Sequence, residues 1–244
     1  MSEAAGLAAA AAEVGLPAIL KTAELGYDGK GQARLSSAEP AALEQAWTAI
    51  GRPAPAADPT EGPAILEGLV DFACEVSVVV ARGLDGRMRS FPPAENRHRD
   101  GILWESRVPA RVSSEIAKAA TAGAESLALA LDLVGLLSVE MFVARDGQVL
   151  INELAPRPHN SGHWSLDAAV TSQFEQHVRA VAGLPRGDPD ALCPAVMTNL
   201  LGDEALEAQA ALTDPRAKLH LYGKAEPRPG RKMGHITRLT DVGP

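Results

Sequence analysis

Residues 138–153 read Ser-Val-Glu-Met-Phe-Val-Ala-Arg-Asp-Gly-Gln-Val-Leu-Ile-Asn-Glu. Two runs of strand-like composition flank Asp146-Gly147, and Asp-Gly between such runs is a strong signal for a two-residue hairpin turn. With that turn Arg145 faces Gln148, and counting outward places Glu140 directly opposite Glu153. The stretch therefore predicts an antiparallel hairpin over residues 137–154.

The two opposed glutamates need an explanation, because like charges directly opposite each other destabilise a sheet. A divalent cation, a basic residue or a shared proton would offset the repulsion, and Mg²⁺ takes carboxylate oxygens together with substrate phosphates. The alternative is a pair of glutamates on a solvated sheet face. Apolar neighbours such as Val139 and Ile151 favour the metal site. Asn152 is expected on the opposite face unless the strand ends or bulges there.

A glycine-rich stretch, Gly26-Tyr-Asp-Gly-Lys-Gly-Gln32, lies between strands expected at 18–22 and 33–36. Glycines let backbone N–H groups approach phosphate oxygens closely. The pattern is not a Walker A loop, because no Gly-Lys-Ser/Thr sequence occurs. With Lys21 on the preceding strand, it is typical either of a flap that closes over a nucleotide or of an ordinary flexible hairpin turn.

The remaining pattern mixes helices with short strands. We expect helices at 2–15, 39–50, 114–134 and about 166–182. Further strands are expected at 64–69 and 73–82, and near 194–200, 217–222 and 233–239, with a proline-rich link at 52–63. Helices combined with largely antiparallel strands indicate an α+β fold.

Composition excludes several classes of protein. The 244 residues are 46% hydrophobic and 22% charged, as in an ordinary globular protein, and the net charge of -8 argues against a nucleic-acid partner. No apolar run is long enough to cross a bilayer, and the Ala-rich start with Glu3 and Glu13 does not resemble a targeting sequence, so we expect a cytoplasmic protein with no membrane partner. Cys74 and Cys193 lack metal-ligand spacing, so neither a disulfide framework nor a zinc site is expected. Positive charge is concentrated only at 224–232.

Three stretches together resemble one enzyme family, the N5-carboxyaminoimidazole ribonucleotide synthases, also known as the ATPase subunit of phosphoribosylaminoimidazole carboxylase. They are the glycine-rich segment 21–32, the segment Ile-Asn-Glu-Leu-Ala-Pro-Arg-Pro-His-Asn-Ser-Gly-His at 151–163, and Arg-Pro-Gly-Arg-Lys-Met-Gly-His at 228–235. Their order is that of the family, and the resemblance runs from about residue 15 to residue 240.

The resemblance implies an ATP-grasp fold, in which two α+β subdomains hold ATP between them, with a small β-rich carboxy-terminal domain. It implies a flap subdomain with its linker at 1–66, a core subdomain at 67–184 and the small domain at 185–244. The family's amino-terminal nucleotide-fold domain is not found in this sequence. We therefore expect either a homodimer or association with a separate amino-terminal domain.

The resemblance also implies an ATP-dependent carbon-nitrogen ligase of purine biosynthesis. ATP, bicarbonate and 5-aminoimidazole ribonucleotide would give the N5-carboxylated ribonucleotide through carboxyphosphate, with Mg²⁺ as the metal. By similarity, the Mg²⁺ ligands are Glu140 and Glu153, and the residues expected to act in catalysis are Lys21, Arg157 and His159. The same comparison assigns nucleotide contacts to Lys21, Gly26, Tyr27, Asp28, Gly29, Lys30, Gly31, Gln32, Glu67, Gly68, Leu69, Val70, Glu75, His98, Asn152 and Glu153. The expected ribonucleotide contacts are Tyr27, Asp28, Arg157, Lys224, Arg231 and Lys232.

Two alternatives remain. One is another carboxylating or amino-acid-ligating ATP-grasp enzyme, against which the segments 159–163 and 228–232 argue. The other is a nucleotide-binding or partner-binding remnant, or half of a split enzyme, without turnover of its own. His177 and His220 are expected to be surface or core residues without a functional role.

Overall fold

The computed structural model describes residues 4–23, 30–51, 53 and 63–240. Two compact units result: Met1–Asp71 with Asp100–Ile102, and Phe72–Arg99 with Leu103–Pro244. We call them unit 1 and unit 2. The expected division into three domains at 66/67 and 184/185 stays a prediction. No helix in the described part of the chain is long and apolar enough to span a membrane.

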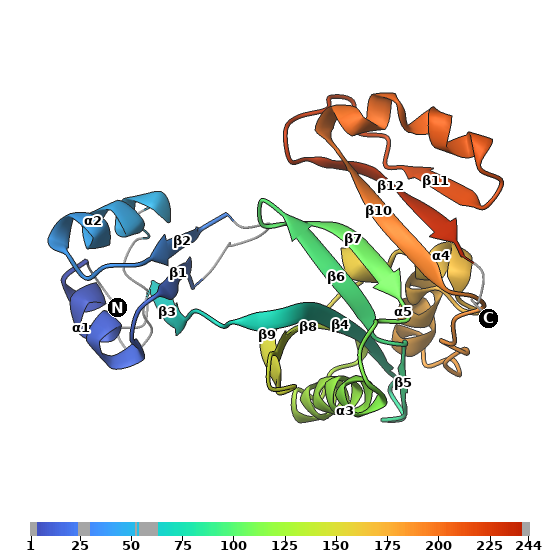
Figure 1. Cartoon of the computed structure of the whole chain (residues 1–244). Helices are drawn as coiled ribbons and strands as arrows, with labels where there is room; N and C mark the ends of the chain where they lie inside the picture. The colour runs from blue at the N-terminus through green and yellow to red at the C-terminus, as the bar shows by residue number, and fades with distance from the viewer. Residues whose placement is uncertain (1–3, 24–29, 52, 54–62, 241–244) are drawn as a thin grey trace. The chain divides into compact units, whose positions relative to one another are not determined.

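Unit 1 contains a three-stranded antiparallel sheet of order β2-β1-β3, built from β1 (Ala18–Thr22), β2 (Gln32–Leu35) and β3 (Ala64–Gly68). Helices α1 (Ala4–Val14) and α2 (Pro40–Ala49) pack on it (Figure 1). Proline at the start of α2 suits the first helical turn, where no N–H partner is needed. The buried face of α2 consists of Leu43, Ala46 and Trp47, which are spaced so that they lie on one side of the helix.

Unit 2 contains a nine-stranded sheet of order β11-β12-β10-β7-β6-β4-β8-β9, with β5 also paired to β4 (Figure 1). The strands are β4 (Phe72–Arg82), β5 (Met88–Ser90), β6 (Ala94–Arg99), β7 (Ile102–Val108), β8 (Gly135–Ala144), β9 (Val149–Ala155), β10 (Ala195–Leu201), β11 (Ala217–Leu221) and β12 (Lys232–Leu239). The pairings recorded in both units are antiparallel, which confirms the α+β prediction. Strands β5, β6 and β7 were not predicted from the sequence.

Helix α3 (Ser114–Ala130) covers one face of this sheet. Its buried residues Ala120, Ala124 and Ala128 form a stripe of small side chains, which lets the helix approach the valines of β4 and β8 closely. The Ser113 hydroxyl accepts a hydrogen bond from Ile116 N and caps the first turn. The helix ends at Ala130, not at 134 as predicted, because the chain turns at Asp132, whose φ is 46°.

The opposite face carries Trp164, α4 (Ser165–Ala168) and α5 (Gln173–Val181). The single helix predicted at about 166–182 is therefore wrong. Ala169 is extended, and the N–H groups of Val170 and Thr171 donate to Asp190 O and Asp188 O instead of continuing the helix. Ser172 then caps α5 through its hydroxyl, which accepts from Glu175 N. Before this interruption, Trp164 and Ala168 pack into the apolar cluster on this face of the sheet.

Candidate functional site

The β8–β9 hairpin places Glu140 opposite Glu153, as the sequence predicts. The turn itself differs from the prediction. Ala144 N donates to Gln148 O at 2.8 Å, and Gly147, at φ 88°, completes a three-residue loop. The resulting shift of one residue is cancelled at Asn152, where the strand bulges between the pairs Met141–Ile151 and Glu140–Glu153. Two local irregularities thus bring the glutamates together.

The carboxyl of Glu140 is the most perturbed acid of unit 2. Its side chain is only 15% exposed. The pKa of Glu140 is raised to about 7, chiefly by burial; the charges of Glu153 and Glu75 also raise it, and those of His98 and Lys232 lower it. A buried carboxyl that faces a second carboxylate and has a nearby lysine is suited to a divalent cation.

His159 reaches Glu140 from the segment that follows β9. Its Nε2 lies 3.3 Å from Oε1 of Glu140. On the other side of the ring, Ser161 N donates to Nδ1 at 3.3 Å, so that Nε2 carries the proton that faces the carboxylate. The backbone of His159 is held by Gln173, whose Oε1 accepts from His159 N at 3.0 Å and whose Nε2 donates to His159 O at 2.8 Å.

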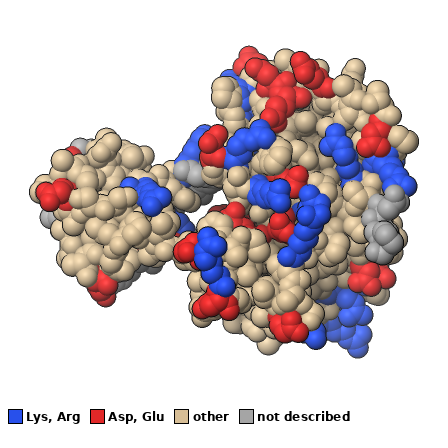
Figure 2. Space-filling view, in the orientation of Figure 1, with Lys and Arg blue, Asp and Glu red and all other residues tan. Residues whose placement is uncertain are grey.

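Glu75 and His98 form a second pair on the same face of the sheet. His98 Nδ1 lies 2.7 Å from Oε2 of Glu75. Burial favours the neutral imidazole, but the hydrogen bond and the charge of Glu75 outweigh it, so the pKa of His98 is raised. Beneath this pair, Asn96 accepts from the Ser106 hydroxyl, which fixes β6 against β7. Figure 2 shows basic side chains gathered around acidic ones on this view of unit 2.

Comparisons with known proteins identify the family. The ATP-grasp domain family matches residues 1–174, and the phosphoribosylaminoimidazole carboxylase C-terminal domain family matches residues 195–242. An N5-carboxyaminoimidazole ribonucleotide synthase of Brucella melitensis is 51% identical over 233 residues, which are 96% of this chain and 62% of the relative. The chain belongs to the N5-carboxyaminoimidazole ribonucleotide synthase family of ATP-grasp proteins.

Solved structures of N5-carboxyaminoimidazole ribonucleotide synthases share the fold. One, an ADP complex, superposes with a TM-score of 0.89 at 46% identity and covers 98% of this chain and 61% of its own. Another, from Aspergillus clavatus with ADP and 5-aminoimidazole ribonucleotide, gives a TM-score of 0.87 at 31% identity, with 98% and 61% covered. The chain thus spans about three fifths of the length of these relatives.

In unit 1 the residues expected to contact the nucleotide lie at both ends of the sheet, with Lys21 and Gln32 at one end and Gly68 beside Ala18 at the other. Lys21 Nζ lies 2.5 Å from Oε2 of Glu67, and β1 and β3, which carry them, are neighbours. Gly68 and Leu69 are exposed and Val70 is half-buried. Gln32 pairs with Lys21, and Gly31 O accepts from Thr22 N at 2.8 Å next to Lys30. Four of the selected residues, Gly26, Tyr27, Asp28 and Gly29, lie outside the described residues.

The basic residues expected to contact the ribonucleotide form two groups. Lys232 at the start of β12 is near enough to the carboxylates to affect the pKa of Glu140 and of His98. Lys224 Nζ donates to the backbone oxygen of Lys232, so the two lysines lie together. Arg157 donates to Pro158 O and Arg231 to Glu226 O, both on exposed loops.

Buried amide side chains that were not predicted from the sequence support this site. Gln173 is fully buried, and its Nε2 also lies 2.8 Å from Nδ1 of His163. Asn160 and Asn199 exchange side-chain hydrogen bonds, and Asn199 also donates to Leu103 O at 2.8 Å. Asn199 sits among apolar residues of a predicted strand, and a buried amide in such a run was the available signal; Gln173 has mainly polar neighbours in the sequence and gave none.

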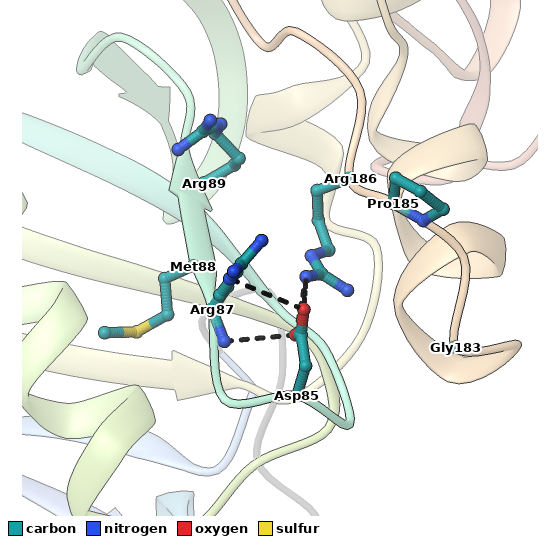
Figure 3. A pocket seen from close by; sticks show the side chains of 7 residues that line it. All are labelled: Asp85, Arg87, Met88, Arg89, Gly183, Pro185 and Arg186. Atoms are coloured by element: carbon teal, nitrogen blue, oxygen red, sulfur yellow. Dashed lines mark hydrogen bonds and ion pairs between the residues drawn. The ribbon is translucent and has the colours of Figure 1, made fainter.

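A separate cavity of about 280 Å³ lies beside the β4–β5 turn (Figure 3). The guanidinium of Arg186 donates to both carboxylate oxygens of Asp85, and Arg87 N donates to the same carboxylate. A Cβ at Gly83 would lie 2.0 Å from Nη1 of Arg186, so any other residue there would displace the guanidinium from its present position. The ion pair ties the segment after α5 to the β4–β5 turn and has no link to Glu140.

Proposed function

We propose that the chain catalyses the ATP-dependent carboxylation of 5-aminoimidazole ribonucleotide. The observation that carries the proposal is the cluster of Glu140, Glu153 and His159, three residues of one β-hairpin and the loop after it. In the first step a bicarbonate oxygen takes the γ-phosphoryl group of ATP, which gives carboxyphosphate and ADP. In the second step the amine nitrogen of the ribonucleotide bonds to the carboxyl carbon, phosphate leaves and the amine loses a proton.

The residues around Glu140 fit the Mg²⁺ that this chemistry uses. Paired carboxylates are the ligands that Mg²⁺ prefers, and the raised pKa of Glu140 reflects a charge that a cation would stabilise. Glu140 and Glu153 would hold the ion, which when bound neutralises charge on the ATP phosphates. Asn152, placed by the bulge next to Glu153, would contribute a further polar group.

The other roles follow the family resemblance. Lys21 would contact the ATP phosphates, and Gly26–Gln32 would cover them. The backbone of 67–70 would bind adenine, Glu75 would bind the ribose, and His98 would be a further nucleotide contact. Arg157 and His159 would orient bicarbonate or accept the proton of the amine. The proposed contacts of the ribonucleotide, with the basic ones at its phosphate, are Tyr27, Asp28, Arg157, Lys224, Arg231 and Lys232.

The second candidate is a nucleotide-binding chain without turnover of its own. The observation that favours it is that the chain spans 62% of the Brucella relative. In that case we propose a homodimer or a separate amino-terminal domain as the partner that supports turnover. A cytoplasmic location is part of both proposals, on the strength of the family alone.

Phosphate release from Mg-ATP, with and without the ribonucleotide and bicarbonate, separates the candidates. The chains to compare are the wild type, Glu153→Ala and, as a control, the exposed Glu207→Ala. Ribonucleotide-stimulated release that Glu153→Ala loses and Glu207→Ala keeps would support the ligase. Calorimetric binding of Mg-ATP without stimulated release would support the second candidate. If the chain neither binds Mg-ATP nor shows stimulated phosphate release, both candidate functions are contradicted.

A further inference from the structure

Two histidines and an aspartate outside the proposed site come together at the β11–β12 side of the unit 2 sheet. They are Asp167 on α4, His220 on β11 and His235 on β12. His220 and His235 are direct cross-strand partners. One potential ligand atom from each residue lies within 4.8 Å of those of the other two. Residues distant in sequence thus present two imidazoles and one carboxylate to a common point.

His235 supplies a second, independent observation. Its side chain is 1% exposed, and its Nε2 is buried with no hydrogen-bond partner among the described residues. Its Nδ1 lies 2.7 Å from the Tyr222 hydroxyl. A buried polar atom without a partner is costly, and it frequently indicates an ion or water that binds there. Burial, followed by the charges of His163 and His220, lowers the pKa of His235 to about 3, so the ring is neutral.

We propose that Asp167, His220 and His235 bind a divalent transition-metal ion, with Zn²⁺ the best match. Two imidazoles and one carboxylate are a common zinc ligand set, with water completing the tetrahedron. Imidazole nitrogen does not suit Mg²⁺, so this site is chemically distinct from the glutamate pair. The ion would link α4 to β11 and β12.

The contacts of the ligands fit this role. In the tautomer that a metal requires, the Nδ1–H of His235 donates to the Tyr222 oxygen and leaves the Nε2 lone pair available. Nε2 of His220 lies 2.9 Å from Oδ2 of Asp167, so only a small movement would admit an ion between them. The expectation of no zinc site came from the cysteines alone, and spacing in the sequence did not connect Asp167 with the two histidines.

The competing explanation is a metal-free histidine cluster. Rings of His220 and His235 stack with centroids 4.6 Å apart, and His163 lies 5.2 Å from His235. In that case Asp167 and His220 form a closed hydrogen-bonded pair, and no ion has a place. That explanation leaves Nε2 of His235 without a partner, which the metal site does not.

Metal titration of the full chain distinguishes the two. The protein is stripped with a chelator and titrated with Zn²⁺ against a chromophoric competitor, and with Co²⁺ by visible absorption. We expect one tight site per chain and a tetrahedral Co²⁺ spectrum. Asp167→Asn and His220→Gln should each weaken Zn²⁺ binding about tenfold or more, and Tyr222→Phe should weaken it less.

His177→Gln and His159→Gln serve as controls, because His177 lies on α5 and His159 at the glutamate cluster. Both variants should keep the tetrahedral Co²⁺ spectrum. Addition of Zn²⁺ should raise their Tm as it raises that of the wild type. Far-ultraviolet circular dichroism establishes that each variant is folded. Failure of the folded wild type to bind, or loss of binding in His159→Gln and not in His220→Gln, would overturn the proposal.

Discussion

Replacing Glu140 by glutamine should make the protein more stable above neutral pH, although Glu140 belongs to the proposed metal site. The pKa of this carboxyl is raised from its usual 4.5 to about 7 in the folded chain. The folded state therefore holds a proton that the unfolded state has lost. Stability contributed by this group is present below pH 4.5 and falls as the pH rises to about 7.

The magnitude follows from the two pKa values. At about 1.4 kcal/mol per pKa unit, the loss between them amounts to about 3 kcal/mol. Glutamine has nearly the same shape, cannot ionise, and can still accept from Nε2 of His159. The unfolding free energy of Glu140→Gln, minus that of the wild type, should thus increase by about 3 kcal/mol between pH 4.5 and pH 8.

Urea unfolding at several pH values with a chelator present is the assay. A Trp47→Phe background leaves Trp104 and Trp164 of unit 2 as the fluorescent reporters. Glu207 is an exposed residue of the same unit, and Glu207→Gln serves as the control. The unfolding free energy of Glu207→Gln, minus that of the wild type, should not change comparably with pH. A difference between Glu140→Gln and wild type that does not change with pH would refute the inferred burial of charge at Glu140.

Three further results are expected. Mg-ADP binding at pH 7 should release about half a proton, because Glu140 is about half protonated there, and this release should vanish near pH 9. Calorimetry in buffers of different ionisation enthalpy measures the number of protons released. Equal release at both pH values would contradict the prediction. Trp164→Ala should cost about 3–5 kcal/mol in urea unfolding, because the ring is 1% exposed and packs edge-on against Phe91, whereas Trp164→Phe should cost less. Gly147→Ala should lower the unfolding free energy by about 1 kcal/mol through the φ of 88° alone, since no atom lies within 4 Å of the added methyl. Gly147→Asn should lower it less, because asparagine adopts positive φ more readily than alanine. Equal losses of unfolding free energy in the two variants would contradict this.

The parts of the fold that the sequence predicted are those governed by local patterns. Helix α3 and strand β4 have long periodic or valine-rich runs, and both were located to within a few residues. The pairing of Glu140 with Glu153 was predicted from a turn type that is wrong, and the bulge at Asn152 cancels the error. A bulge depends on the contacts of both neighbouring strands, so the sequence of one hairpin cannot locate it.

Strands β6 and β7 were missed for a physical reason. Along β6 the inward residues Asn96 and His98 are polar, because this part of the sheet lies at the proposed site and not in an apolar core. The usual alternation of apolar and polar residues is therefore absent. A signal did exist: Asp100 and Gly101, both at positive φ, form a tight turn between the two strands, the same dipeptide that indicated the β8–β9 hairpin.

The cluster around His159 was beyond sequence reasoning. Its contact with Glu140 depends on Gln173, which holds the backbone of the loop from a helix that begins 14 residues later. No local pattern relates these positions, and the predicted continuous helix at 166–182 would have placed Gln173 differently. Interrupted helices of this kind are determined by tertiary hydrogen bonds, here those of residues 170–171 with 188–190.

The strand order of unit 2 has a consequence for synthesis on the ribosome. Strand β7 ends at Val108 and bonds on one side to β10, which begins only at Ala195. Until β10 has been synthesised, the nascent protein carries β7 as an unpaired strand edge. Such an edge can pair with another chain, so this interval is when aggregation is most favoured and when a chaperone would have the greatest effect on yield.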